Sequence, residues 1–130
     1  MNLKYIVKKL ARKCVYGAAE NSISYVAALR KIGISIGDGT IFYDPTTTTI
    51  DTQNPKLLKI GNNVRITKGV TILTHDYSWS VVSGVYGECL GGIGKVIIGD
   101  NVFIGINAIV LKGVKIGENV IIGAGSVVSN

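Results

Sequence analysis

The chain has 130 residues, which suggests a single domain, and 47% of them are hydrophobic against 17% that are charged. This composition excludes a disordered chain, because disorder needs few apolar residues and a high net charge. The net charge is +6, but residues 1–33 carry it, with seven Lys or Arg against one acid, whereas residues 34–130 are neutral. A general affinity for nucleic acid is therefore not expected.

The N-terminus is charged and lacks the apolar core of a secretory signal. No apolar run reaches the roughly 18 residues that a membrane-spanning helix needs. We therefore expect a cytoplasmic protein. Cys14 and Cys89 lie far apart in the sequence and are expected to be free thiols in that compartment.

The N-terminal segment is predicted to be helical. Apolar residues recur at three- and four-residue spacing over residues 2–14, and lysines and arginines occupy the remaining faces. A second helix is expected over residues 22–32, with Asn21 or Ser22 as N-cap and Gly33 just past its end. Two interpretations remain open: a helical cap with a solvated basic side, or a basic amphipathic element that makes weak contact with an anionic membrane surface or an acidic partner.

From residue 34 onward the sequence repeats with a period of six. In IGDNVF, IGINAI, VLKGVK, IGENVI and IGAGSV, a large aliphatic residue begins each unit and a smaller residue follows four positions later. The first positions are Ile98, Ile104, Val110, Ile116, Ile122 and, in the next unit, Val128. Earlier copies occur at IGDGTI (36–41) and at IGNNVR, ITKGVT and ILTHDY (60–77).

Each six-residue unit is predicted to form a short strand followed by a bend. Such a unit cannot bury its apolar face alone, so successive units must coil and stack as a solenoid. Three sides per coil would place Ile98 under Ile116 and Ile104 under Ile122. An antiparallel β-sandwich is disfavoured, because strands this short, each followed by a bend, would form few hydrogen bonds with their neighbours.

The stretch LTHDYSW holds the single histidine, His75, and the single tryptophan, Trp79. The register starts at Ile72, breaks after His75 and resumes at Ile98, an offset that is not a multiple of six. Residues 76–95 are therefore expected to leave the coil as a loop. Loops on a rigid scaffold are where functional sites are usually built.

These motifs resemble the hexapeptide-repeat acyltransferases over about residues 34–130. The resemblance implies a mainly β fold, a left-handed parallel β-helix of triangular section, preceded here by the short α-helical segment of residues 1–33. That handedness departs from the usual right-handed crossover. The interrupted stretch from Ile72 to Gly99 looks most like the sugar and polysaccharide O-acetyltransferases, the group that includes maltose and galactoside acetyltransferases. Their use of acetyl-CoA, with no metal, and their homotrimers with sites between subunits are implied for this chain.

By this resemblance His75 is the catalytic base. It would take the proton of an acceptor hydroxyl that attacks a thioester, and would then protonate the leaving thiolate. Asp76 is a candidate for orienting the ring or stabilising the imidazolium, as a carboxylate does in triads. Adjacent side chains often point to opposite sides, so a backbone carbonyl or Glu88 from the loop are alternatives.

The expected acceptor is a sugar or a polysaccharide precursor. Its candidate binding residues are Asn54, Tyr77, Trp79 and Glu88. Tyr77 and Trp79 are suited to pack against sugar C–H surfaces, but they serve equally well to anchor the loop. Asn54, in DTQNPK, matches loosely a region in which the family contacts its acceptor with an asparagine.

The pantetheine arm of CoA is bound in the family largely by backbone amides. The matching positions are Gly105 and Ile106 in FIGIN, and Gly123 and Ala124 in IGAGS. An amide there could donate to the oxyanion, although these glycines also suit tight turns. Lys112 and Lys115 could meet CoA phosphates or only keep the protein soluble.

Three alternatives to this function remain. A serine acetyltransferase usually carries a larger helical domain and a second functional histidine, and neither is visible. A β-helix hydratase needs three histidine ligands per zinc. In the family, the segment that matches GAGSVVSN is followed by another partial coil and a tail over CoA, so a truncated, inactive binding or scaffold protein is the non-enzyme alternative.

Overall fold

The computed structural model of the chain describes residues 22–88 and 91–130. The helix expected over residues 2–14, the N-cap candidate Asn21, and both cysteines lie outside the described residues. Within them, helix α2 (Ser22–Lys31) comes first and twelve short strands follow. The strands are β1 (Ser35–Ile36), β2 (Ile41–Phe42), β3 (Thr49–Ile50), β4 (Leu58–Ile60), β5 (Arg65–Ile66), β6 (Thr71–Ile72), β7 (Val96–Ile98), β8 (Phe103–Ile104), β9 (Ile109–Val110), β10 (Lys115–Ile116), β11 (Ile121–Ile122) and β12 (Val127–Val128).

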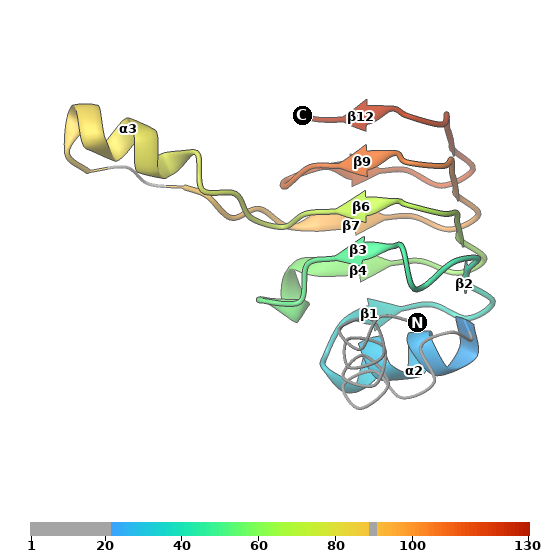
Figure 1. Cartoon of the computed structure of the whole chain (residues 1–130). Helices are drawn as coiled ribbons and strands as arrows, with labels where there is room; N and C mark the ends of the chain where they lie inside the picture. Colours follow the sequence, from blue (N-terminus) through green and yellow to red (C-terminus); the bar gives the residue numbers. More distant parts are fainter. Residues whose placement is uncertain (1–21, 89–90) are drawn as a thin grey trace, which may run out of the picture.

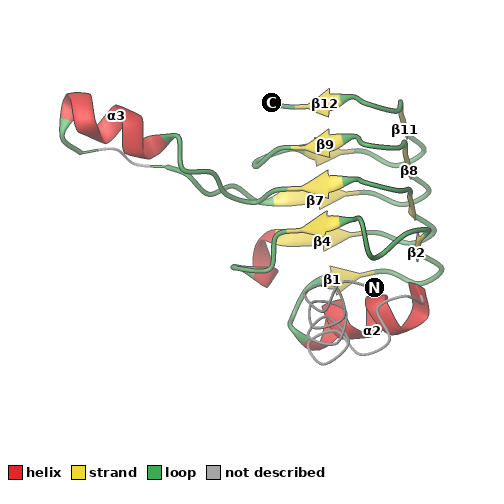
Figure 2. Ribbon diagram, viewed as in Figure 1, coloured by secondary structure: helices red, strands yellow, loops and turns green. Residues whose placement is uncertain are grey.

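The strands form three parallel sheets that enclose one core (Figures 1 and 2). Sheet A has the order β1-β4-β7-β10, sheet B the order β2-β5-β8-β11, and sheet C the order β3-β6-β9-β12. The chain visits sheets A, B and C in turn, so three strands make one coil and there are four coils, numbered 1 to 4. Ile98 pairs with Ile116 and Ile104 with Ile122, which confirms the predicted stacking of three sides per coil.

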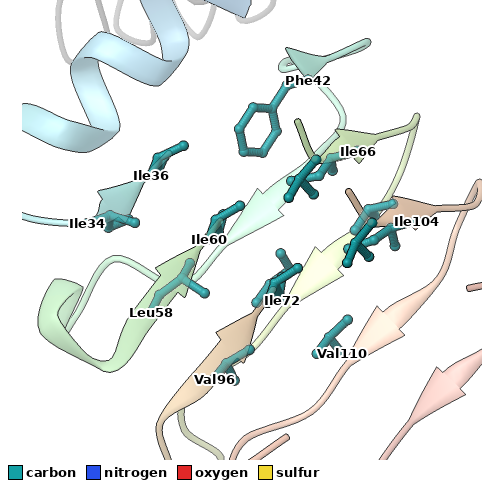
Figure 3. Packing of buried hydrophobic residues seen from close by; sticks show 14 of the residues in the cluster. Ile34, Ile36, Phe42, Leu58, Ile60, Ile66, Ile72, Val96, Ile104 and Val110 are labelled. Carbon is teal, nitrogen blue, oxygen red and sulfur yellow. The ribbon is translucent and has the colours of Figure 1, made fainter. Parts of the chain in front are cut away.

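The core is a set of stacked aliphatic columns. The first residue of each hexapeptide unit points inward. Ile60, Ile98 and Ile116 therefore form one column, and Phe42, Ile66 and Ile104 form another (Figure 3). All six are buried. Because each unit has only a two- or three-residue strand, burial of these columns supplies most of the drive for coiling.

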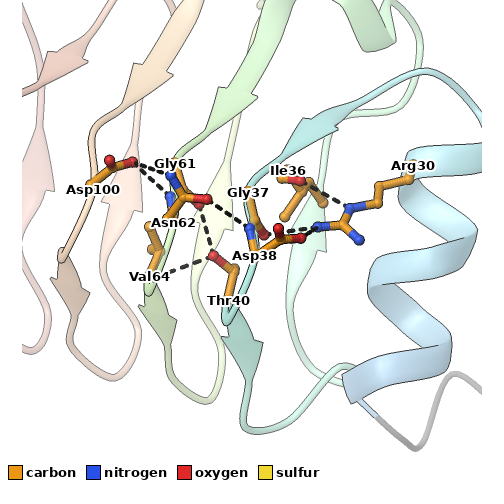
Figure 4. A network of polar contacts seen from close by, with 9 residues as sticks. All are labelled: Arg30, Ile36, Gly37, Asp38, Thr40, Gly61, Asn62, Val64 and Asp100. Carbon is orange, nitrogen blue, oxygen red and sulfur yellow. Dashed lines mark hydrogen bonds and ion pairs between the residues drawn. The ribbon is translucent and has the colours of Figure 1, made fainter.

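The corners between the sheets are tight turns that the sequence builds with asparagine and glycine. Four asparagines have φ between 52° and 58°, a left-handed conformation that asparagine tolerates better than most residues. They are Asn63, Asn101, Asn107 and Asn119. At the corner between sheets A and B, Asp38 N donates to Asn62 Oδ1 and Asn62 N donates to Asp100 Oδ1, so polar side chains join successive coils (Figure 4).

Helix α2 covers the open end of coil 1. Its buried Tyr25, Val26 and Leu29 face the core, and the Tyr25 ring meets Phe42 edge-on at a centroid distance of 5.0 Å. Arg30 donates to Ile36 O at 2.9 Å and pairs with Asp38 (Figure 4). The helix ends one residue before the predicted end, and Gly33 follows with a φ of 105°, in agreement with its predicted place. Among the described residues, no helix has the length and apolarity to cross a membrane.

Two excursions leave the coil at the corner between sheets C and A, which we call the C–A corner. Residues 51–57 lead from coil 1 to coil 2 and include a short 3-10 helix, η1 (Pro55–Leu57). Residues 73–88 and 91–95 lie between coil 2 and coil 3 and stand away from the β-helix as an arm (Figure 1). The predicted loop over 76–95 is partly helical, because Trp79–Tyr86 form helix α3. Residues 73–88 and 91–95 are called the arm below.

Candidate active site

His75 lies at the base of the arm, just after strand β6. Its side chain is 22% exposed, so the ring is enclosed on most sides but remains accessible. Its Nδ1 is hydrogen-bonded to Oδ2 of Asp51. Asp51 follows strand β3 in coil 1 and reaches His75 because β3 and β6 are neighbours in sheet C, with Ile50 paired to Ile72. Two adjacent coils thus supply the pair.

The Asp51 carboxylate is buried and fully engaged. Its Oδ2 accepts from the backbone N of Thr74 at 3.1 Å and from the Thr74 hydroxyl at 2.6 Å, and its Oδ1 accepts from Gln53 N at 3.0 Å. Burial by itself raises the pKa of Asp51, but the hydrogen bonds from Thr74, Gln53 and His75 outweigh it and lower this pKa to about 2. Asp51 is therefore an anion at neutral pH.

The backbone around His75 is held by Gly92 and Ile93, where the arm returns to the coil. His75 forms an antiparallel bridge with Ile93, and Asp76 N donates to Gly92 O at 2.8 Å. Gly92 has a φ of 119°, and a Cβ there would lie 2.7 Å from the Trp79 ring, so this position needs glycine. The Tyr77 ring meets the His75 ring edge-on, with centroids 5.3 Å apart. The base of the arm therefore fixes where His75 sits.

Asp76 is occupied elsewhere. Its Oδ1 accepts from the backbone N of Ser78 at 3.0 Å and from the Ser78 hydroxyl at 2.6 Å, and its Oδ2 lies 2.9 Å from Lys112 Nζ. Lys112 first and Ser78 second lower the pKa of Asp76 to about 2. The carboxylate bonded to the His75 ring is that of Asp51, so the contact predicted for Asp76 is instead made across two coils.

A sequence signal for Asp51 existed. The stretches TIDT (49–52) and TILTH (71–75) each contain the inward isoleucine of the third unit in a coil, Ile50 or Ile72. Residues that follow stacked positions lie near each other in a solenoid. The insertions between coils 1 and 2 hid this correspondence, because they break the period of six.

The four residues predicted to bind the acceptor lie in different parts of the C–A corner and the arm. Tyr77 and Trp79 are exposed at the base of the arm. Asn54 is exposed at the start of η1, three residues after Asp51 and at the same C–A corner. Glu88 is exposed beyond the far end of α3, and the described contacts of the His75 side chain come from Asp51 and Tyr77.

The four candidate CoA positions lie at another corner, the one between sheets B and C, which we call the B–C corner. Gly105 and Ile106 follow β8, and Gly123 and Ala124 follow β11 in the next coil. A Cβ on Gly105 would lie 2.5 Å from Ala124 N, so these turns are stacked in close contact. The Gly105 amide donates to Ile122 O at 2.9 Å and is therefore already used within the coil.

The two lysines that could bind the CoA phosphates also lie in different places. Lys112 is paired with Asp76 at the C–A corner, whereas Lys115 is exposed on the outer face of sheet A. In the described part of the chain, no group of three or more His, Cys, Asp or Glu side chains is arranged to hold a metal ion.

Comparisons with known proteins agree with this architecture. Residues 95–130 match the family model "Bacterial transferase hexapeptide (six repeats)". The chain is 44% identical over 86 residues to protein CapG of Staphylococcus aureus, and 38% identical over 78 residues to YvoF of Bacillus subtilis (strain 168), a candidate acetyltransferase by name. These alignments cover 66% and 60% of this chain but 49% and 40% of the relatives, so the chain spans about half the length of the curated relatives that it matches.

The crystal structure of a maltose O-acetyltransferase from Clostridium difficile 630 superposes with a TM-score of 0.59 at 26% identity, over 97% of this chain and 75% of that one. The fold is a left-handed parallel β-helix built from hexapeptide repeats, with a short helix before it. The resemblance to the hexapeptide-repeat acyltransferases that the repeat indicates is thereby confirmed.

Proposed function

We propose that this chain is an O-acetyltransferase that moves the acetyl group of acetyl-CoA to a hydroxyl of a sugar or polysaccharide precursor, with His75 as general base. The observation that carries the proposal is the single histidine of the chain. It is partly exposed at the base of the arm, and its Nδ1 is bound by a buried carboxylate. The similarity to a maltose O-acetyltransferase supports the acceptor class.

One general base is enough for both proton transfers of the proposed reaction. His75 Nε2 takes the proton of the acceptor hydroxyl as its oxygen bonds to the acetyl carbon, and the C–S bond of the thioester then breaks. The imidazolium returns the proton to the sulfur, so the products are the acetyl ester and the CoA thiol. The nearby Asp51 anion stabilises the imidazolium that forms in between.

A homotrimer with sites between subunits is the assembly that this function favours. His75 lies at the C–A corner, and the candidate CoA positions lie at the B–C corner of the same chain. One triangular coil holds these corners apart, whereas a three-fold arrangement can bring the C–A corner of one protomer against the B–C corner of the next. The acceptor would then bind near Tyr77, Trp79 and Asn54.

The first test measures release of the CoA thiol from acetyl-CoA with a panel of sugar acceptors. We expect turnover by the wild type and a fall in kcat of roughly 10²- to 10⁴-fold for His75→Ala, the usual contribution of a general base. Lys59→Ala, on the exposed outer face of sheet A, is the matched control and should retain activity.

Two results would contradict the proposal. Undiminished turnover by His75→Ala would remove the base from the mechanism. A wild type that binds acetyl-CoA in calorimetry but releases no thiol with any acceptor would instead indicate the inactive binding protein.

A further inference from the structure

The Asp51 carboxylate joins the two excursions at the C–A corner. Through Oδ1 it accepts from Gln53 N, which bends the start of its own excursion. Through Oδ2 it accepts from the Thr74 amide and hydroxyl and bonds to the His75 ring. Its side chain is 3% exposed, so water does not compete for these contacts.

The chemistry of this contact selects one form of the histidine ring. An ionised carboxylate accepts hydrogen bonds and donates none, so the proton between the two side chains belongs to Nδ1. A neutral imidazole carries one proton, and a ring protonated at Nδ1 has its lone pair on Nε2. Nε2 is then the atom available to take a proton from an acceptor.

Asp76 shows that proximity in sequence does not produce the same effect. Its side chain is 40% exposed, and its two oxygens are taken by Ser78 and Lys112. Because it adjoins His75 in the chain without bonding to its ring, it offers a carboxylate control beside the same histidine.

We propose that Asp51 is the positioning residue of His75: it selects the Nδ1-protonated tautomer and holds the ring at the base of the arm, and Thr74 holds Asp51 in turn. The catalytic meaning of this rests on the proposed function, since positioning matters for turnover only if His75 is the base. The tautomer itself is a property of the folded chain and can be measured without turnover.

The decisive measurement is the ring ¹⁵N spectrum of the folded protein at a pH where the ring is neutral. His75 is the single histidine of the sequence, so uniform histidine labelling gives ring signals that need no assignment. We expect the wild type and Asp76→Ala to show a protonated Nδ1 and an unprotonated Nε2. Asp51→Ala and Asp51→Asn should both shift the ring toward the Nε2-protonated form, because alanine removes the acceptor and the amide group of asparagine can donate to Nδ1.

Two substitutions test whether Thr74 holds Asp51 in place. Thr74→Val removes the hydroxyl that donates to Asp51 at almost unchanged volume, whereas Thr74→Ser keeps it. We expect partial loss of the Nδ1-protonated form in the first and none in the second. If Asp51→Ala does not fold, Asp51→Asn and Thr74→Val still test the proposal through a graded change in the same signals.

Activity provides the second measurement. Asp51→Ala should lower kcat by about 10²-fold, within the range expected for misplacing a general base, and should leave KM for acetyl-CoA nearly unchanged. An Nε2-protonated wild type, or a ring tautomer unaffected by Asp51→Ala, would overturn the assignment. If the tautomer follows Asp51 as expected while the wild type turns over no acceptor, the positioning contact stands and the proposed function fails.

Discussion

Asp51 and Asp76 have pKa values lowered to about 2 for different physical reasons. Asp51 is buried, and its pKa is lowered by hydrogen bonds that exceed the opposing effect of burial. The pKa of Asp76 is lowered by Lys112 and Ser78 at a partly exposed site, where salt and water weaken the attraction. The two carboxylates should therefore respond differently to pH and to salt.

We predict an acid-dependent loss of stability that traces to Asp51. A carboxyl whose folded pKa lies below its ordinary value of 3.8 stabilises the protein above that value and loses this contribution as pH falls toward about 2. The shift corresponds to about 2 kcal/mol. Urea unfolding of the wild type between about pH 5 and pH 2 should show this fall, and Asp51→Asn should flatten it.

The salt dependence separates the two sites. Added salt should reduce the acid-dependent contribution of Asp76, measured as the difference between the wild type and Asp76→Asn, and should leave that of Asp51 nearly unchanged. An equal salt effect on both variants would show that the Asp51 carboxylate is exposed in solution.

At the scale of structural elements, the coils depend on glycine where two turns meet. A Cβ on Gly105 would lie 2.5 Å from Ala124 N and 2.8 Å from the carbonyl carbon of Gly123. Gly117 occupies the same place in its hexapeptide unit, but a Cβ there would meet nothing within 4 Å. The two glycines therefore form a matched pair.

We predict that Gly105→Ala lowers the free energy of unfolding by roughly 1–3 kcal/mol, the usual cost of overpacking. Gly117→Ala should be neutral or stabilise by up to about 1 kcal/mol, because alanine restricts the unfolded chain. Urea unfolding at one protein concentration checks both. Equal effects of the two substitutions would mean that the turns at the B–C corner do not stack as described.

Helix α3 is the element for which the sequence pattern was least informative. Its eight residues, WSVVSGVY, carry no charge, and none of them is buried. The break in the period of six predicts a loop and locates the excursion correctly. That break contains no information on the conformation inside it, so the short helix went unrecognised.

At the scale of the whole molecule, the arm carries apolar side chains that the single chain leaves in water. Val81 and Val85 of α3 are 73% and 71% exposed, and Tyr86 is exposed beside them. Contiguous exposed apolar surface of this kind is typical of an interface. Phe103, Ile121 and Val127 are exposed on the outer faces of sheets B and C, where a second copy could receive such a surface.

We predict that the double substitution Val81→Glu and Val85→Glu dissociates the proposed trimer. Light scattering after gel filtration should give the mass of three chains for the wild type and a smaller mass for the variant. Lys59→Gln with Lys115→Gln, on the exposed outer face of sheet A, changes the net charge equally and should leave the assembly intact. A wild type of one-chain mass, or a double variant that remains trimeric, would contradict the prediction.

The coil follows from the amino-acid sequence alone. The period of six located most of the strands and the inward columns, and in coils 3 and 4 the spacing of 18 residues paired Ile98 with Ile116. These features are local, since each unit repeats the same requirement for an inward aliphatic side chain and a bend. The break after His75 was visible for the same reason.

The side-chain contacts at the site depend on how the coils pack in three dimensions. Between coils 1 and 2 the paired residues of sheet C are 22 positions apart, from Ile50 to Ile72, because the insertions at the corners depart from the repeat. That spacing brings Asp51 to Thr74 and His75, whereas sequence adjacency favoured Asp76. The contact depends on how many residues are inserted at each corner, and the packing of whole coils fixes this number.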